Sequence, residues 1–210
     1  MFYFVKTPVW LKKIYSGCTW QMNTVEKKIY LSFDDGPHPV ATKFVLQVLE
    51  KYNARATFFC IGKNVAAYPE VYQQILAGGH AVGNHTFNHL NGWKTPVGMY
   101  IENIEQAQQL IKTNLFRPPY GKISFKQLKA LSVKQPTLKV IMWSVLSADF
   151  DRKITPEKCC RNVLENTGNG SIVVFHDSEK AFENLQFALP KMVQHFSRLG
   201  YNFEKIDCVN

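Results

Sequence analysis

The sequence lacks both the long apolar runs of a membrane protein and the cysteine pattern of a disulfide-stabilised one. No stretch approaches the roughly 20 apolar residues that a membrane-spanning helix requires. The cysteines number five, two of them are adjacent, and none forms Cys-x-x-Cys, which excludes a disulfide framework. The N-terminal apolar run stops at Lys6, too early for a secretory signal. We therefore expect a cytoplasmic protein.

Low-complexity segments, repeats and flexible linkers are absent as well. A chain of 210 residues with 46% hydrophobic and 20% charged residues is expected to fold around one core. Residues 1–27 are rich in aromatics, and we expect them to form an arm packed on the core of a domain spanning residues 28–210. Interfacial attachment of this arm to a membrane is the alternative.

Acidic residues are fewer than basic ones, so the net charge is +9. Such a charge suits an anionic partner. The lysines are scattered and form no block, however, which is typical of a well-solvated basic surface. We therefore expect no nucleic-acid partner and no membrane span.

Short apolar segments with strand character alternate with segments of helical periodicity. Strands are predicted at 28–33, 56–61, 80–84, 115–117, 138–143, 171–175 and 201–206. Helices are predicted at 40–52, 69–77, 99–113, 124–131, 156–166 and 181–199. This alternation indicates parallel strands with right-handed crossovers. Seven such units predict an α/β fold of the barrel type, closed or incomplete.

Polar residues with catalytic chemistry follow the ends of these strands. In a β/α barrel the carboxyl ends of the strands converge on one face, where active sites form. The residues placed there are Asp34, Asp35, His85, His89, Arg117, Asp149 and His176.

Two of these clusters have the composition of a one-metal hydrolase. Imidazole and carboxylate ligands suit zinc and its divalent neighbours. One aspartate of the pair Asp34-Asp35 can bind the ion, which leaves the other as a base. His85 and His89 would point the same way if residues 84–90 form a helical turn.

The remaining polar residues suit supporting roles. Arg117 can orient a catalytic carboxylate, and the prolines after it form a rigid turn. A general acid needs a pKa near the working pH, which suits His176. Asp149 can fix the tautomer of that imidazole and raise its basicity.

Five ordered motifs then carry a family resemblance. They are Ser32-Phe33-Asp34-Asp35-Gly36-Pro37, His85-Thr86-Phe87-Asn88-His89, Arg117-Pro118-Pro119-Tyr120, and looser matches at Asp149-Phe150 and Val174-Phe175-His176. From about Lys28 to Ile206 the chain resembles the NodB-type polysaccharide deacetylases of carbohydrate esterase family four. The resemblance implies a distorted seven-stranded (β/α)7 barrel with its active site at the C-terminal ends of the strands.

The resemblance also implies a cofactor and a substrate class. Asp35, His85 and His89 would bind one divalent metal, with zinc expected first and cobalt, manganese, nickel or iron as alternatives. The substrate would be an N-acetylated oligo- or polysaccharide, from which acetate is released. We expect the protein to act as a monomer.

Catalytic roles follow from the same resemblance. Asp34, held by Arg117, would be the base that activates the attacking water. A backbone N–H near Tyr120 would help to stabilise the oxyanion. His176, oriented by Asp149, would protonate the departing amine.

The fourth and fifth motifs depart from the family pattern. The resemblance implies a substrate pocket at Pro119, Trp143, Phe150 and Val174. The usual first carboxylate of the fourth motif is Leu146 here, and Phe150 replaces a tryptophan. Val174 replaces a leucine. These changes affect the fine tuning of the site and the shape of the acyl pocket.

Three other functions remain open at the level of sequence. O-deacetylation would use the same machinery on an easier bond. Hydrolysis of a small linear or cyclic amide would favour a lidded pocket, whereas a long groove lined by Trp93, Tyr120 and Trp143 would favour a glycan. The altered fourth motif is also compatible with a glycan-binding pseudoenzyme.

Overall fold

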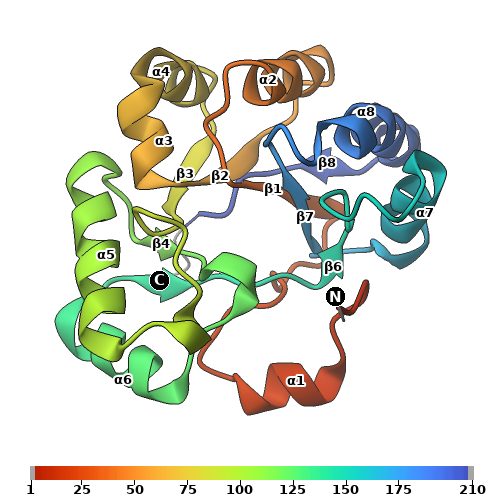
Figure 1. The fold of residues 1–210 in the computed structure, drawn as a ribbon. Coiled ribbons are helices and arrows are strands. Elements are labelled where there is room, and N and C mark those ends of the chain that lie inside the picture. The colour runs from red at the N-terminus through yellow and green to blue at the C-terminus, as the bar shows by residue number, and fades with distance from the viewer. Residues whose placement is uncertain (1–2, 208–210) are drawn as a thin grey trace.

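A curled parallel sheet forms the centre of the protein (Figure 1). The structure is a computed structural model, and it describes residues 3–207. Along the sheet the strands follow the order β5-β4-β3-β2-β1-β7-β6. Their bounds are β1 Lys28–Asp34, β2 Ala56–Cys60, β3 Ala81–Asn84, β4 Leu115–Phe116, β5 Lys139–Val140, β6 Val145–Leu146 and β7 Ile172–His176. The sheet is a half-barrel, which confirms the distorted seven-stranded barrel predicted from the sequence.

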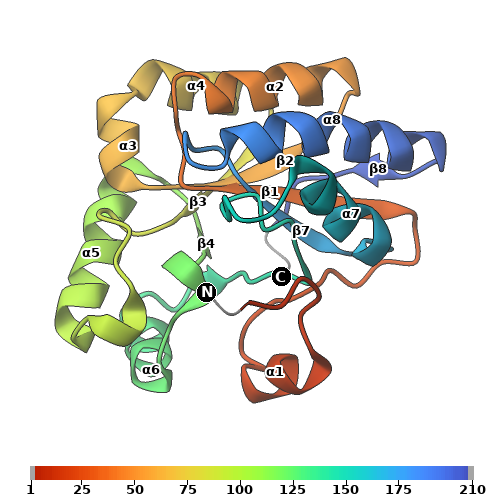
Figure 2. The ribbon, with the colours of Figure 1, turned by 45° about the vertical axis from the view of Figure 1, so that its right-hand side comes forward.

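Helices cover the outside of this sheet (Figures 1 and 2). They are α2 Ala41–Lys51, α3 Gly62–Ala67, α4 Pro69–Ala77, α5 Val97–Leu110, α6 Phe125–Lys134, α7 Pro156–Asn166 and α8 Phe182–Arg198. Helix α1, Val9–Ile14, lies apart from them in the N-terminal arm. Short 3-10 turns lie at Gly92–Lys94 and Pro119–Gly121. Strand β2 is buried along its whole length, as expected of a parallel strand covered on both faces. Each of the six predicted helices buries one face against the core, which explains the helical spacing of its apolar residues.

The strand register places the chemistry at one edge of the sheet. Asp34 at the end of β1 lies beside His176 at the end of β7. On the other side of β1, Asp34 pairs with Phe59 of β2, and Cys60 of β2 pairs with Asn84 of β3. The residues that follow β1, β3 and β7 are therefore brought together by the backbone alone.

The seven-stranded path differs in one strand from the prediction. The strand expected at 138–143 is only two residues long, and the loop after it contributes β6, which pairs with β7. The strand expected at 201–206 is β8, Asn202–Phe203, which pairs with the first two residues of β1 outside the path. Strands of two residues carry no readable alternation, so their register was invisible in the sequence.

The N-terminal arm runs along the open side of the half-barrel, between β5 and β6. Leu146 N–H donates to the carbonyl of Val5 at 2.8 Å, and Thr7 N–H donates to the carbonyl of Ser144 at 3.0 Å. Further along the arm, Thr19 exchanges backbone hydrogen bonds with Val140 and Met142 at 2.9 and 2.7 Å. We call residues 3–22 the strap, because they span the gap that the two edge strands leave.

Among the helices of residues 3–207, none combines the length and the apolar character needed to span a bilayer. The longest is α8, with 17 residues.

Candidate active site

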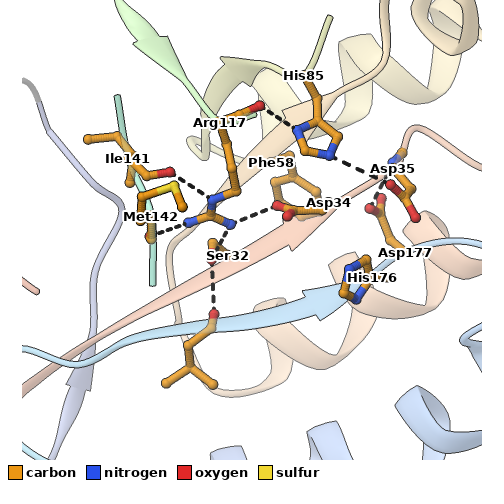
Figure 3. Close-up of polar contacts among 12 residues, drawn as sticks. Ser32, Asp34, Asp35, Phe58, His85, Arg117, Ile141, Met142, His176 and Asp177 are labelled. Atoms are coloured by element: carbon orange, nitrogen blue, oxygen red, sulfur yellow. Dashed lines mark hydrogen bonds and ion pairs between the residues drawn. The ribbon is translucent and has the colours of Figure 1, made fainter. Parts of the chain in front are cut away.

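A buried ion pair lies at the end of β1 (Figure 3). Arg117 Nη1 is 2.7 Å from Asp34 Oδ1, and it also donates to Ser32 Oγ at 2.8 Å. The remaining guanidinium donors bond the backbone carbonyls of Ile141 and Met142. Arg117 has no solvent exposure and Asp34 is 3% exposed. Each of the three guanidinium nitrogens thus donates at least one hydrogen bond, and Asp34 is held in one position.

The turn after β1 presents Asp35 to the same region. Asp35 adopts a left-handed backbone, with φ at 79°. Asp177 fixes this turn, because its N–H donates to the carbonyl of Asp34 and its Oδ1 accepts from Gly36 N–H at 3.1 Å. A Cβ at Gly36 would lie 2.1 Å from Asp177 Oδ2, so only glycine fits there. Asp177 was not identified from the sequence.

His85 and His89 converge, but not through a helical turn as predicted. Residues 85–90 form a loop in which Thr86 and His89 have φ values of 62° and 55°. The side chain of Asn103 accepts backbone N–H groups from this loop. The two imidazole rings lie 5.1 Å apart between centroids. Local hydrogen bonding, rather than helical periodicity, brings them together.

Asp35, His85 and His89 fit a divalent metal. One ligand atom from each lies within 4.8 Å of the others. Asp35 Oδ1 is 3.1 Å from His89 Nε2 and 3.7 Å from His85 Nε2. This oxygen is buried and has no hydrogen-bond partner among residues 3–207. Such an atom is expected where the partner is a bound cation. Two imidazoles and one carboxylate are a donor set that zinc accepts in catalytic sites.

The protonation states also suit ligation. Burial lowers the pKa of His85 to about 4, so its ring is neutral near pH 7. His85 Nδ1 lies 2.7 Å from the carbonyl of Arg117, to which a neutral ring donates, leaving the Nε2 lone pair toward Asp35. For Asp35, burial acts to raise the pKa, but contact with His89 and the charge of His176 lower it overall. Asp35 therefore stays ionised.

His176 and Asp149 form a second buried pair. Asp149 Oδ1 accepts from His176 Nδ1 at 2.7 Å, and its Oδ2 accepts from the His176 backbone N–H at 2.7 Å. Burial acts against the charged imidazole, but Asp149 outweighs it and raises the pKa of His176 to about 9. The ring is thus protonated at neutral pH, with Nε2–H as its free donor direction.

These groups surround a pocket of about 420 Å³. Asp34, Asp35, His85, His89 and His176 line it. Its walls also carry the aromatic side chains Trp93, Tyr120, Trp143 and Phe150. The Tyr120 ring lies 4.6 Å from that of His89, and its φ of 61° turns the chain sharply at this point.

Two residues predicted for the pocket lie outside its lining. Val174 is fully buried in β7. It shares a face with His176 but lies one layer deeper, because side chains on one face of a strand recur every two residues. Pro119 is buried beneath the turn that presents Tyr120. Leu146, which stands where a carboxylate was expected, does line the pocket.

Part of the pocket wall comes from the strap. Tyr3, Phe4, Thr7 and Leu11 all line the pocket. The Tyr3 ring packs edge-on against Phe150 with centroids 5.6 Å apart, and Phe150 packs in the same way on His176 at 5.1 Å. Aromatic richness marked the arm in the sequence, but no signal indicated that it reaches the site.

A half-barrel with these polar side chains at the carboxyl ends of its strands defines an α/β-barrel hydrolase. The sequence profile described as polysaccharide deacetylase matches residues 21–135. A peptidoglycan-N-acetylglucosamine deacetylase of Bacillus cereus is 33% identical over 191 residues, covering 88% of this chain and 89% of the relative. A chitooligosaccharide deacetylase of Azorhizobium caulinodans is 36% identical over 160 residues, covering 72% of this chain and 74% of the relative.

Solved structures agree with the sequence matches. The crystal structure of the Bc1960 peptidoglycan N-acetylglucosamine deacetylase, in complex with 4-naphthalen-1-yl-N-oxidanyl-benzamide, superposes with a TM-score of 0.82 at 28% identity. The match covers 95% of both chains. This chain belongs to the NodB-type polysaccharide deacetylase family, carbohydrate esterase family 4.

Proposed function

We propose that this protein is a metal-dependent hydrolase that removes N-acetyl groups from an N-acetylhexosamine-containing glycan and releases acetate. The observation that carries the proposal is the convergence of an Asp-His-His cluster, an Arg-held aspartate and an Asp-held histidine around one aromatic-walled pocket. Membership of a family of glycan deacetylases supports the substrate class.

Asp35, His85 and His89 would hold the metal. When bound, a divalent ion supplies Lewis-acid polarisation and makes a water more acidic. Zinc suits this donor set first, and cobalt, manganese, nickel and iron are the alternatives. The buried His85 and the ionised Asp35 are already in the protonation states that ligation requires.

Asp34 is proposed as the general base. Its carboxylate lines the pocket next to Asp35, and Arg117 fixes it through a 2.7 Å contact. A base held this rigidly loses little entropy when it takes a proton from the attacking water. The backbone N–H at Tyr120 is proposed to stabilise the oxyanion that forms as the acetamide carbonyl is attacked.

His176 is proposed as the general acid. The acetamide nitrogen is a poor leaving group unless it receives a proton as the C–N bond breaks. A protonated His176, kept so by Asp149, supplies that proton from its pocket-facing nitrogen. The products are acetate and a free amino sugar.

The pocket walls support a sugar rather than a small amide. Trp93 and Tyr120 line the pocket and are 62% and 49% exposed, so both side chains offer accessible surface to a ligand. Aromatic faces with hydrogen-bonding edges suit the apolar and polar sides of a pyranose. Trp93, Tyr120 and Trp143, which the sequence analysis associated with a glycan, all line this pocket. The monomeric state and the cytoplasmic location stay predictions.

Acetate release from N-acetylglucosamine oligomers tests the proposal. The protein is treated with a chelator and assayed with and without added zinc or cobalt. Asp34→Asn is compared with Asp207→Asn. The latter changes an exposed aspartate that does not line the pocket. We expect metal-dependent release by the wild type and by Asp207→Asn, and none by Asp34→Asn.

Two other outcomes would replace the proposal. Oligomer binding without release, despite one bound metal per chain, would identify a glycan-binding pseudoenzyme. Neither binding nor release, with turnover of small linear or cyclic amides, would identify an amide hydrolase. Parallel assays on O-acetylated polysaccharide separate N- from O-deacetylation.

A further inference from the structure

We propose that the outer face of α1 docks the protein on an anionic lipid bilayer. None of the residues of α1 is buried, and Figures 1 and 2 show the helix at the margin of the molecule, remote from α2 and α4. Val9, Trp10 and Ile14 are 67%, 55% and 52% exposed. An exposed group of large apolar side chains is unusual on a soluble protein surface and marks an interaction site.

The exposed residues share one side of the helix. At 100° per residue, Val9, Lys13, Trp10 and Ile14 fall within an arc of about 140°. Phe4, itself 36% exposed, extends this face through an edge-on contact with Trp10 at 6.2 Å. We call Phe4, Val9, Trp10, Lys13 and Ile14 the docking face. Leu11 falls on the opposite side of α1 and lines the substrate pocket.

The charge around the docking face indicates what covers it. Residues 1–25 contain Lys6, Lys12 and Lys13 and no aspartate or glutamate. Among residues 3–207, no ion pair involves any of these three lysines. Lys6 and Lys13 are exposed. A local excess of positive charge without internal compensation is complementary to an anionic surface.

Lipid fits this combination better than a protein partner does. Lysine is depleted in protein–protein interfaces, whereas tryptophan and lysine together are typical of interfacial membrane contacts. In such a contact Val9, Trp10 and Ile14 would enter the headgroup boundary while the lysines meet lipid phosphates. Because Leu11 is part of the pocket wall, docking would hold the pocket beside the lipid surface.

Vesicle co-sedimentation of the full chain tests the docking face. The probes are vesicles of phosphatidylcholine alone and of phosphatidylcholine mixed with phosphatidylglycerol. We expect the wild type to partition onto the anionic vesicles only, and to be released by salt. Trp10→Ser/Ile14→Ser should lower the partition coefficient at least about tenfold. Lys6→Gln/Lys13→Gln should lower it about 25-fold, at about fivefold per lysine.

Control variants remove exposed lysines and an exposed apolar side chain elsewhere. Lys43→Gln/Lys51→Gln removes two exposed lysines of α2, and Val25→Ser removes a valine that is 97% exposed. Both should partition like the wild type. Circular dichroism checks that every variant is folded, and all should hydrolyse soluble oligomers equally. If the wild type does not hydrolyse these oligomers, the deacetylase proposal is overturned and the docking result still stands.

Several results would overturn the docking proposal. Failure of the wild type to sediment with either kind of vesicle would do so, as would sedimentation of the docking-face variants at the level of the controls. A dimer in light scattering that Trp10→Ser/Ile14→Ser converts to a monomer would assign the face to a second copy of the chain instead.

Discussion

Replacing Asp149 by asparagine should move the alkaline limb of the pH–rate profile. In the wild type Asp149 contacts His176 Nδ1 at 2.7 Å and raises the pKa of the imidazole from 6.5 to about 9, against the opposing effect of burial. Asparagine removes the negative charge and leaves the burial. Asp34 and Asp35 still act to raise the pKa of His176 in the variant, so it should fall from about 9 toward the ordinary value of 6.5.

The size of the effect follows from the fraction of protonated acid. At pH 8, a group with a pKa of about 9 is about 90% protonated, and a group with a pKa of 6.5 is about 3% protonated. Asp149→Asn should therefore lower kcat/KM by up to about thirtyfold at pH 8 through protonation alone. Near pH 5 both forms are protonated, and the remaining loss reports the orientation of the ring.

The assay is kcat/KM for N-acetylglucosamine oligomers across pH with metal-loaded protein, since kcat/KM reports the pKa values of the free enzyme. Glu179→Gln is the matched control, because Glu179 is exposed and three residues from His176. Its profile should overlay that of the wild type. An alkaline limb at the same pH in Asp149→Asn and wild type would refute the assignment of His176 as the acid.

The same pair makes stability depend on pH. The pKa of folded His176 lies above its unfolded value, so its stabilising contribution is fully present below about pH 6.5. That contribution is lost as the pH rises through about 9. Asp149→Asn should flatten this dependence, which urea titrations at several pH values can measure.

Three further predictions concern other contacts of the site. Arg117→Met leaves Asp34 buried without its cation and should lower the free energy of unfolding by about 3–5 kcal/mol in urea titrations; a loss below about 1 kcal/mol would contradict the pairing. Zinc should raise the melting temperature of the wild type but not of Asp35→Ala, because a ligand of the folded state stabilises it; equal shifts would remove Asp35 from the ligand set. Tyr3→Ala should raise KM for oligomers about tenfold, whereas Tyr3→Phe keeps the ring on Phe150 and should retain the wild-type KM; equal KM values in both variants would exclude Tyr3 as a pocket wall.

The arrangement of the polar clusters could be predicted because parallel strands impose it. Asp34 and His176 end adjacent strands in register, so their proximity follows once both segments are recognised as strands. The Arg117–Asp34 and Asp149–His176 contacts follow the expected pairing. Hydrophobic runs in the sequence were sufficient to locate these strand ends.

The backbone conformation that brings the two histidines together could not be predicted from the sequence. A spacing of four residues is typical of a helix, yet Thr86 and His89 adopt left-handed backbone conformations. In this loop the Thr86 N–H donates to Asn84 Oδ1 and the Phe87 N–H donates to Asn103 Oδ1, and Asn103 lies in a helix that follows the loop. Side chains that cap a loop from another element leave no pattern within the loop itself.

The strap was invisible for a related reason, and its position explains why it matters. Strands β5 and β6 are the two edges of the half-barrel, and each is two residues long. Without the strap, both edges would expose unpaired backbone groups. Val5 and Thr19 accept, and Thr7 and Thr19 donate, backbone hydrogen bonds that satisfy those groups. Almost any residue can make such backbone bonds, so they impose no sequence pattern. The pairing also fixes where the neighbouring side chains lie, and it brings Tyr3 onto Phe150, beside the proposed acid. The same backbone pairing thus closes the sheet and positions part of the pocket wall. A change that weakens this pairing should therefore alter substrate binding before it alters the metal cluster.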